Sequence, residues 1–282
     1  MIVAPGAEPT GGRRAAARRP PEGAYDGDVG ARIDLNADVG EGLGPWPMGD
    51  DAALIPLVTS VNVACGFHGG DPLTIRRTVR LALDAGCAVG AHPGYPDLVG
   101  FGRREMELAA DELEAAVLYQ VAALAGIVRA EGGRLAHVKP HGALYNRAAA
   151  DPAVAGAVAR AVAAADPGLR FVGPPGSALL EAGAAAGLAC LAEGFADRAY
   201  EADGRLRSRR LPGALLDDPV RAGAQAVSIA RDGRVTAIDG TVLPLAAATL
   251  CVHGDTPGAA AIAAAVRREL AAAGITVRAP GD

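Results

Sequence analysis

The sequence predicts an α/β fold, a β/α barrel of seven strands, and two observations lead to this fold class. From Ile33 onward, short apolar runs end in Gly- or Pro-rich turns and are followed by Ala-rich helical stretches. Repeated units of this kind predict a parallel sheet with right-handed crossovers. The chain has 282 residues, so residues 32–282 would form one domain of the usual barrel length of about 250 residues. A doubly wound open sheet is the alternative.

The expected strands are short apolar runs that each precede a turn. They cover residues 32–37, 59–65, 87–91, 135–139, 169–173, 188–193 and 248–252. The expected helices between them cover about 72–85, 110–131, 152–165, 176–187, 217–231 and 257–273. Asp111, Asp151 and Thr256 stand where helix N-caps are expected, the last two followed by proline at the first helical position. Residues 233–243 predict a hairpin around Asp239-Gly240.

Composition narrows the class of protein. The formal net charge is −5 and aromatic residues make up only 4% of the chain, which argues against a nucleic-acid binder. No apolar run reaches the roughly 20 residues that span a bilayer, so a membrane protein is not expected. The four cysteines form no C-x-x-C pair and suggest no disulfide framework, which favours a reducing cytoplasm. Residues 1–31 lack hydrophobic periodicity, and we expect them to form a disordered extension.

Rare polar residues gather after the expected strands. Four of the five histidines, His68, His92, His141 and His253, occur in such segments, whereas His137 lies inside a strand and is expected to be structural. Since the carboxyl ends of barrel strands meet at one mouth, a titratable pocket is predicted there. The other residues expected to face it are Asn36, Asp38, Glu41, Asn62, Lys139, Asn146 and Asp255. Each has a plainer interpretation; Glu41 could merely bind loop amides, and Asp71 could be only an N-cap.

Lys139 is the only lysine among the 27 lysines and arginines of the chain. It stands at an expected strand end, beside Pro140 and His141. Arginine cannot replace a compact ammonium group whose pKa can be shifted. We therefore expect Lys139 to contact a substrate anion or to assist proton transfer.

The segment 193–209 is too polar for the core and is expected to form a long loop over the pocket. It carries Glu193, Asp197, Arg198 and Tyr200, and its arginines would suit a carboxylate or phosphoryl group. Arg103 follows the third strand in the same way.

A P-loop is excluded because the only lysine precedes a proline. The chain contains neither H-E-x-x-H nor G-x-S-x-G. Cys65 and Cys251 lie near histidines, but their apolar flanks favour buried packing thiols over nucleophiles.

Seven segments together resemble the LamB/YcsF lactam-utilisation family over about residues 32–277. They read IDLNADVGEG, SVNVACGFHGGDP, GAHPGYPDLVGFGRR, QVAALAG, VKPHGALYN, EGFADRAYEADGRLRSR and CVHGDTP. One departure is Ala37, which stands where cysteine is common in the family. The resemblance implies a seven-stranded barrel like those of glycoside hydrolases and polysaccharide deacetylases. It also implies ATP-dependent opening of 5-oxoproline to L-glutamate, as the first component of a three-part 5-oxoprolinase that includes subunits B and C.

For that reaction we expect Asp38 or His68 as the base, Lys139 and His141 as phosphoryl or oxyanion partners, and Arg198 on the substrate carboxylate. The complex would require ATP; a divalent metal such as Mg is compatible with the site, and no tightly bound organic cofactor is expected. Two alternatives stay open. One is a stand-alone metal-dependent amide or N-acetyl hydrolase, with Asp38, His68 and His92 as the metal ligands. The other is a subunit that binds 5-oxoproline without catalysis.

Overall fold

The computed structural model describes residues 31–256 and 258–281. Residues 1–30, which belong to the extension expected to be disordered, lie outside the described residues. Pro257, expected at the first helical position, lies outside them too. That residues 32–282 form a single domain stays a proposal.

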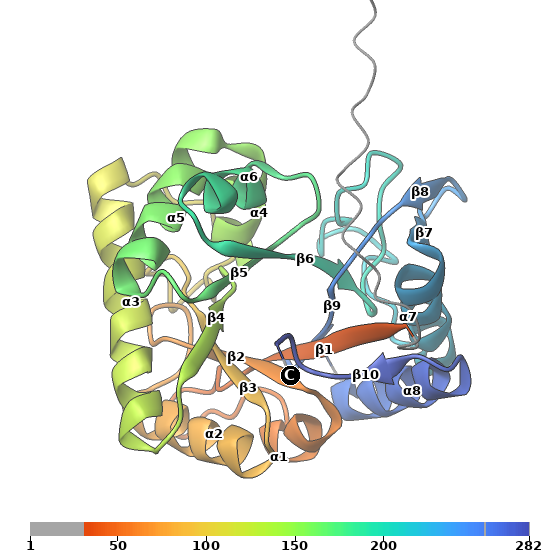
Figure 1. The fold of residues 1–282 in the computed structure, drawn as a ribbon, viewed down its shortest axis with the longest axis horizontal. Helices are drawn as coiled ribbons and strands as arrows, with labels where there is room; N and C mark the ends of the chain where they lie inside the picture. The colour runs from red at the N-terminus through yellow and green to blue at the C-terminus, as the bar shows by residue number, and fades with distance from the viewer. Residues whose placement is uncertain (1–30, 257, 282) are drawn as a thin grey trace, which may run out of the picture.

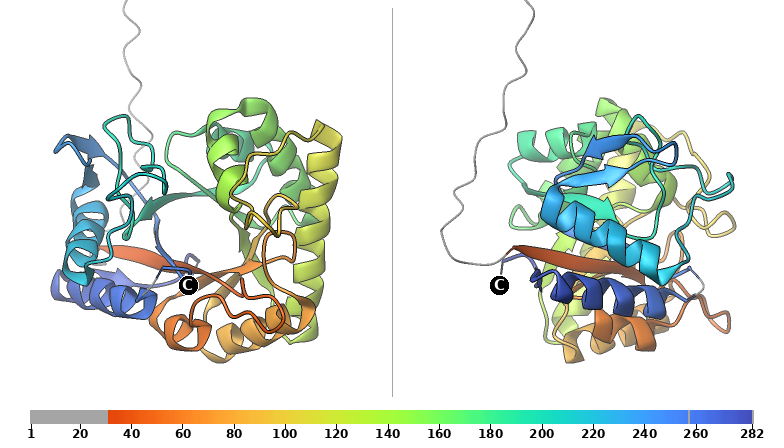
Figure 2. Two further views of the ribbon diagram at one scale, coloured as in Figure 1. Left: turned by 180° about the vertical axis from the view of Figure 1, so that it is seen from behind. Right: turned by 90° about the vertical axis from the view of Figure 1, so that its right-hand side faces the viewer.

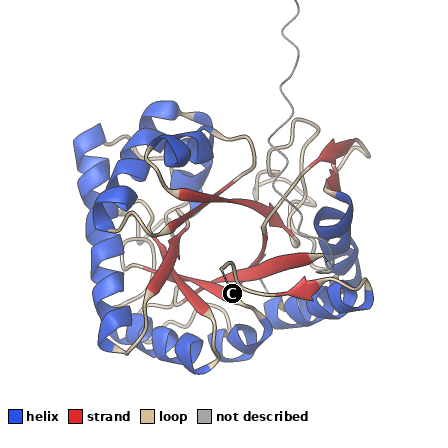
Figure 3. Cartoon of the chain, viewed as in Figure 1, coloured by secondary structure: helices blue, strands red, loops and turns tan. Residues whose placement is uncertain are grey.

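Seven parallel strands of the described residues close into a barrel (Figure 3). They are β1 (Arg32–Val39), β2 (Ser60–Ala64), β3 (Ala88–His92), β4 (Leu135–Val138), β5 (Arg170–Gly173), β6 (Ala189–Phe195) and β9 (Thr249–His253). Each of the first six pairs with the next strand along this order, and β9 pairs back with β1 to complete the ring. The barrel prediction is confirmed, and closure excludes the open doubly wound sheet.

Helices surround the strands (Figure 1). They are α1 (Asp51–Leu54), the 3-10 turn η1 (Ile55–Leu57), α2 (Pro72–Asp84), α3 (Ala110–Ala130), α4 (Gly142–Ala150), α5 (Pro152–Ala165), α6 (Ala178–Ala185), α7 (Pro219–Asp232) and α8 (Ala259–Ala272). Their buried apolar faces pack on the outward-pointing strand residues, such as Leu35, Val61 and Val89, to form the core between strands and helices.

Three expectations about local structure need correction. Helix α4 was not expected, because it is short and begins at Gly142, which has a positive φ of 54° and no side-chain cap before it. Asp111 lies in the first turn of α3, whose N-cap is Ala109. Helix α8 begins after Gly258, so Thr256 is not its N-cap. Asp151 is confirmed as an N-cap.

Two small elements flank the barrel. Strands β7 (Arg234–Thr236) and β8 (Val242–Pro244) form the expected antiparallel hairpin, which lies on the side that carries α7 (Figure 2). The short strand β10 (Thr276–Val277), which was not expected, extends the sheet beside the start of β1.

Helix α3 is, by length and composition alone, apolar enough to cross a membrane. It packs against α5 and the strands β3 and β4. It buries Leu113, Val117, Val121, Leu124 and Val128 within the core. These contacts account for its apolar sequence as that of a barrel helix.

Polar side chains fill the interior of the barrel. Successive side chains of a strand point to opposite faces, so Asp34, Asn36 and Asp38 of β1 all point inward. Asn62 of the neighbouring strand β2 bonds to Asn36, and His137 of β4 bonds to Asn62. A polar interior needs a partner for every buried donor and acceptor, and these partners determine what reaches the mouth.

Candidate active site

A cleft of about 1790 Å³ lies over the carboxyl ends of the strands. The expected site residues that line it are Asp38, His92, Arg103, Lys139, His141, Asn146, Glu193, Arg198, Tyr200 and His253. The segment after β6, from Ala196 to Leu211, forms one wall, as expected for a loop over the pocket. Glu41, His68, Asp197 and Asp255 do not line the cleft, and Asn36 and Asn62 lie beneath it inside the barrel.

Lys139 stands at the end of β4 and is almost fully buried at 2% exposure. Its ammonium nitrogen lies 2.9 Å from a Glu193 carboxylate oxygen, 3.1 Å from Asp38 Oδ1 and 3.0 Å from Cys251 Sγ. Burial alone would lower the pKa of Lys139, but the neighbouring carboxylates, Asp38 first, raise it well above its ordinary value. Lys139 is therefore a permanent cation whose three N–H groups all have partners.

The two carboxylates beside Lys139 are held by further donors. The second oxygen of Glu193 accepts from the Tyr145 hydroxyl at 2.9 Å, and Asp38 Oδ1 accepts from Asn62 at 2.9 Å. Burial alone would raise the pKa of Asp38, but His92 and Lys139 hold it well below its ordinary value. An ionised carboxylate of low pKa is a weak base.

Below this level, two asparagines connect the strands. Asn36 donates to Glu193 at 3.0 Å and to Thr249 at 2.7 Å, and Asn62 donates to Asn36 at 2.7 Å. His137 contacts Asn62 Oδ1 at 2.8 Å, which fits the structural role expected for it. We call Asn36, Asp38, Asn62, Lys139 and Glu193 the lysine network; every polar side-chain atom in it has a partner or faces the cleft.

His253 ends strand β9 and forms a pair with Asp197. Its Nδ1 lies 2.9 Å from Asp197 Oδ1, and its backbone N–H donates to Asp197 Oδ2 at 2.9 Å. Burial alone would raise the pKa of Asp197, but His253 holds it below its ordinary value, so Asp197 is ionised. Because that carboxylate only accepts, His253 Nδ1 carries a hydrogen, and Nε2 is the other ring nitrogen of a residue that lines the cleft. An aspartate that fixes a histidine in this way prepares it to accept a proton.

Arg198 is 6% exposed and lies in the loop wall of the cleft. It donates to the backbone carbonyls of Ala214 and Arg207, at 3.2 and 2.6 Å. Burial, and next the neighbouring Arg209, lowers its pKa to about 10, so it is still charged at neutral pH. Within the described residues it forms no ion pair, which leaves a buried cation facing the cleft without an anion.

Asp255 connects two arginines at the mouth. It lies 2.6 Å from Arg103 and 3.2 Å from Arg209, which belong to different loops. These ion pairs link the loop after β3, the loop after β6 and the end of β9. Asp255 thus holds the mouth of the cleft together rather than facing into it.

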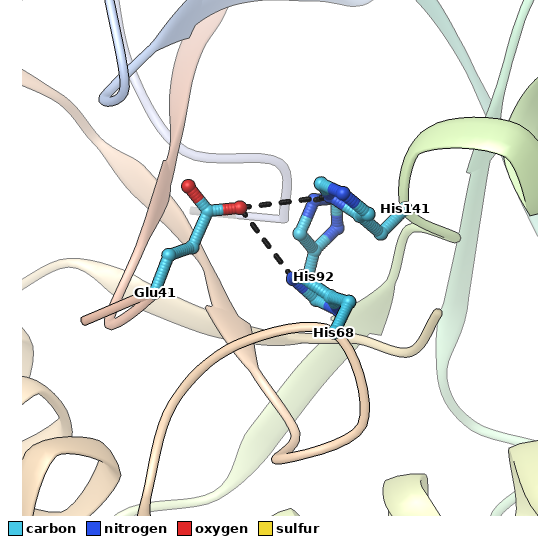
Figure 4. Close-up of side chains that lie close together, drawn as sticks. All are labelled: Glu41, His68, His92 and His141. Carbon is cyan, nitrogen blue, oxygen red and sulfur yellow. Dashed lines mark hydrogen bonds and ion pairs between the residues drawn. The ribbon is translucent and has the colours of Figure 1, made fainter. Parts of the chain in front are cut away.

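A second group of titratable residues reaches the cleft through His92 and His141, and we call it the histidine cluster: Glu41, His68, His92 and His141 (Figure 4). Four consecutive strands supply it, because Glu41 follows β1, His68 follows β2, His92 ends β3 and His141 follows β4. One ligand atom from each lies within 4.8 Å of those of the others. Of the metal ligands expected together, His68 and His92 both belong to this cluster, and Asp38 Oδ2 lies 3.3 Å from His92 Nε2. Glu41 is the carboxylate of this group, and Asp38 belongs to a second group with Cys251 and His253.

Several contacts of the site were not expected from the sequence. Tyr145, the partner of Glu193, follows His141 by four residues and so lies one helical turn further along α4. Asp34 continues the alternation of Asn36 and Asp38, and that period of two is the signal that could have placed it inside the barrel. Cys251 has a partner in Lys139, and burial raises its pKa, which makes it a neutral thiol.

A closed β/α barrel with a charged cleft at the carboxyl ends of its strands is the architecture of a barrel enzyme. Within that class the chain belongs to the LamB/YcsF family, whose model matches residues 33–282.

Named relatives agree with this assignment. The chain is 62% identical over 248 residues to the 5-oxoprolinase A subunit of Chloroflexus aggregans, covering 88% of this chain and 98% of the relative. It is 59% identical over 249 residues to that of Methylococcus capsulatus, covering 88% and 96%. Among solved structures, the lactam utilization protein from Thermus thermophilus matches with a TM-score of 0.83 at 50% identity, covering 88% of this chain and 99% of that one.

Proposed function

We propose that this chain is the A component of an ATP-dependent 5-oxoprolinase, which opens 5-oxoproline to L-glutamate together with subunits B and C. The name shared by the relatives supports the reaction. The observation that carries the proposal is that one cleft is lined by two prepared groups. They are Arg198, a buried cation without an ion pair in the described part of the chain, and His253, which Asp197 orients. A small anionic lactam needs both a cation to hold it and a base to activate water.

Arg198 is proposed to bind the substrate carboxylate. A guanidinium group matches a carboxylate with two parallel hydrogen bonds, and two of its N–H groups are already fixed to the loop backbone. The cleft has a surplus of arginines around this position, which favours the entry of an anion. They are Arg103, Arg104, Arg147, Arg205, Arg207, Arg209 and Arg210.

His253 is proposed to accept the proton of the attacking water, with Asp197 holding its tautomer. This differs from the expectation of Asp38 or His68 as the base. Asp38 is an ionised carboxylate bonded to Lys139 and Asn62, and His68 does not line the cleft.

The proposed chemistry uses ATP to overcome the resonance of the lactam. Transfer of a phosphoryl group to the lactam oxygen releases ADP and makes the ring carbon electrophilic. Water then adds to that carbon and the C–N bond breaks, which opens the ring and leaves an acyl phosphate of glutamate. A second water hydrolyses this acyl phosphate to glutamate and phosphate. The positive charge of Lys139 at the floor of the cleft would stabilise the negative charge that develops on oxygen.

We assign the handling of ATP to the partner proteins, in line with the missing P-loop motif. The proposed location is the cytoplasm, where ATP and reduced cysteines are both maintained; the four cysteines of the described residues are free thiols.

The test is glutamate release from 5-oxoproline and ATP, measured for this chain alone, for subunits B and C alone, and for all three together. The proposal expects release only in the full mixture, with ADP formed alongside glutamate. Release by subunits B and C without this chain would contradict it.

The histidine cluster gives one rival a specific basis, namely a metal-dependent hydrolase that acts alone. The same assay separates the two, because the rival predicts ring opening or deacetylation by this chain with a divalent metal and without ATP. A protein that only binds 5-oxoproline is distinguished by His253→Gln, which would leave turnover of the mixture unchanged.

A further inference from the structure

The histidine cluster holds buried polar atoms that nothing in the described part of the chain satisfies. His68 is 1% exposed and Glu41 is 5% exposed. Both ring nitrogens of His68 and Oε1 of Glu41 are buried without a hydrogen-bond partner. A buried donor or acceptor without a hydrogen-bond partner costs free energy. A native cluster of such atoms therefore indicates a place where a ligand binds.

The hydrogen bonds of two other members fix where their lone pairs point. His92 Nδ1 lies 2.7 Å from the carbonyl oxygen of Lys139, and His141 Nε2 lies 2.9 Å from that of Phe101. A carbonyl oxygen only accepts, so both of these nitrogens carry hydrogen. The remaining nitrogens, His92 Nε2 and His141 Nδ1, face each other at 2.9 Å, and His92 Nε2 also lies 3.3 Å from Asp38 Oδ2. Two lone pairs at that distance repel unless something positive lies between them.

The surroundings support the rings as they would support ligands. Metal-bound histidines almost always donate their second ring N–H to a backbone carbonyl or a carboxylate, as His92 and His141 do. Phe101 presents its carbonyl from a left-handed backbone with φ of 54°, the one non-glycine residue of the described chain with positive φ. Such a conformation is maintained where the surrounding structure requires it.

The spacing also fits one ion. Two ligands that each lie about 2.0–2.1 Å from a tetrahedral ion are about 3.3 Å apart. Glu41 Oε1 lies 3.5 Å from both His141 Nδ1 and His68 Nε2, close to that value (Figure 4). The ring of His68 stacks flat on that of His141, with centroids 3.7 Å apart. Parallel rings do not direct their lone pairs to one point, so His68 is expected to contribute least to binding the ion.

We propose that the histidine cluster binds one divalent first-row transition-metal ion of the zinc class, held by Glu41, His92 and His141, with His68 beside them. Imidazole-rich sites suit zinc and its neighbours, whereas magnesium prefers oxygen ligands and retains its waters. The site therefore differs in ligands and in metal from a magnesium ion that would accompany ATP. His92 and His141 line the cleft, so the ion would lie in its wall.

The test is metal binding by the intact chain, which needs no activity. Chain stripped with a chelator is titrated with Zn²⁺ alone and with Co²⁺ alone, and bound metal is measured after dialysis together with the visible Co²⁺ spectrum. We expect about one ion per chain and cobalt bands of a four- or five-coordinate site. Millimolar Mg²⁺ should leave both unchanged.

Variants locate the ion. Glu41→Gln and His141→Gln are expected to weaken Zn²⁺ binding by about 100-fold or more, and His68→Gln by less. His137→Gln and His253→Gln are matched controls, since both alter buried barrel histidines outside the cluster, and they should bind as the parent does. Thermal melting of each metal-free variant checks folding.

Two results would overturn the proposal. If the parent protein takes up neither zinc nor cobalt, the contact between His92 and His141 is explained by a shared proton and not by a metal. Binding that survives Glu41→Gln and His141→Gln but disappears with His253→Gln would move the ion to the group of Asp38, Cys251 and His253.

Discussion

The lysine network and the histidine cluster are neighbours in the same barrel, and they differ in how far their polar atoms are satisfied. Around Lys139 the charges are paired, and each buried polar atom has a partner. In the cluster, Glu41 and His68 keep buried atoms that have none. The difference teaches that a buried polar group identifies a ligand site only after its partners have been counted. The lysine network is complete in itself, whereas the histidine cluster is complete only with a ligand.

The largest effect is expected from Lys139→Met, which removes the cation of the lysine network. It leaves Asp38 and Glu193 as two buried carboxylates without their shared cation, and we expect a loss of about 3–5 kcal/mol in the free energy of unfolding. Urea denaturation of the chain measures it.

Arg160→Met is the matched control for that change. Arg160 forms an ion pair with Glu114 at 2.8 Å on the surface, with 56% of its side chain exposed. Such pairs contribute about 1 kcal/mol or less. If both variants lose the same small amount, the charges around Lys139 are not desolvated as described.

Arg198 resembles the histidine cluster in lacking a partner, because it is a buried cation without an ion pair among the described residues. In the three-protein mixture, Arg198→Gln is expected to raise KM for 5-oxoproline by about 10- to 100-fold with a smaller change in kcat. The reason is that its charge is reserved for the substrate. Arg207→Gln removes bonds within the same loop to Pro212 and Glu201 and only one of the several other arginines of the cleft, so it serves as the control and should raise KM much less. An equal rise in both variants would assign Arg198 to loop structure.

The pH dependence of stability reports on the histidine below the lysine network. Burial, and next Lys139, lowers the pKa of His137 from 6.5 to about 3. Between these values the unfolded chain binds a proton that the folded chain does not, so stability falls as the pH falls through this window.

The expected loss from His137 is about 1.4 kcal/mol for each pH unit below its unfolded pKa. Urea denaturation between pH 7 and pH 4 measures it, and His137→Gln, which keeps a donor toward Asn62, should reduce the slope. Burial also lowers the pKa of His68 and of His141, and both contribute slope of the same sign in both proteins. An unchanged slope in the variant would contradict a neutral, buried His137.

The smallest effect is expected at a helix cap whose side chain belongs to neither group. The Asp71 carboxylate accepts from the backbone N–H groups of Leu73 and Thr74, as expected for the N-cap of α2. Asp71→Ala should cost about 1 kcal/mol in the free energy of unfolding, and Asp71→Asn only a part of that. A thermal or urea denaturation series of the three proteins measures the difference, and equal stability of all three would remove the cap from the account.

Most of the fold could be predicted from the sequence, because strands, helices and turns are encoded by patterns of neighbouring residues. Strand and helix periods, with turn residues between them, predicted every strand of the barrel within about two residues and every long helix. Helix α4 escaped because it is nine residues long and starts at Gly142, which is unfavourable for a helix except where the backbone needs positive φ.

The site was predictable as a set of residues but not as a set of pairs. The rule that strand ends converge selected His253, Asp197, Glu41 and Lys139. Which of them pair depends on the register between strands and on loops that fold back over the mouth. The Asp197–His253 pair joins residues 56 positions apart, and no local pattern encodes that contact.

The central claim is that ring opening takes place in the cleft of this chain, with His253 taking the proton from water. The direct measurement is kcat for glutamate release by the three-protein mixture containing His253→Gln, compared with the parent and with His137→Gln. The account predicts a loss of about 100-fold or more for His253→Gln alone, with its melting temperature preserved. Turnover equal to that of the parent would contradict it, because the base would then lie elsewhere in the complex.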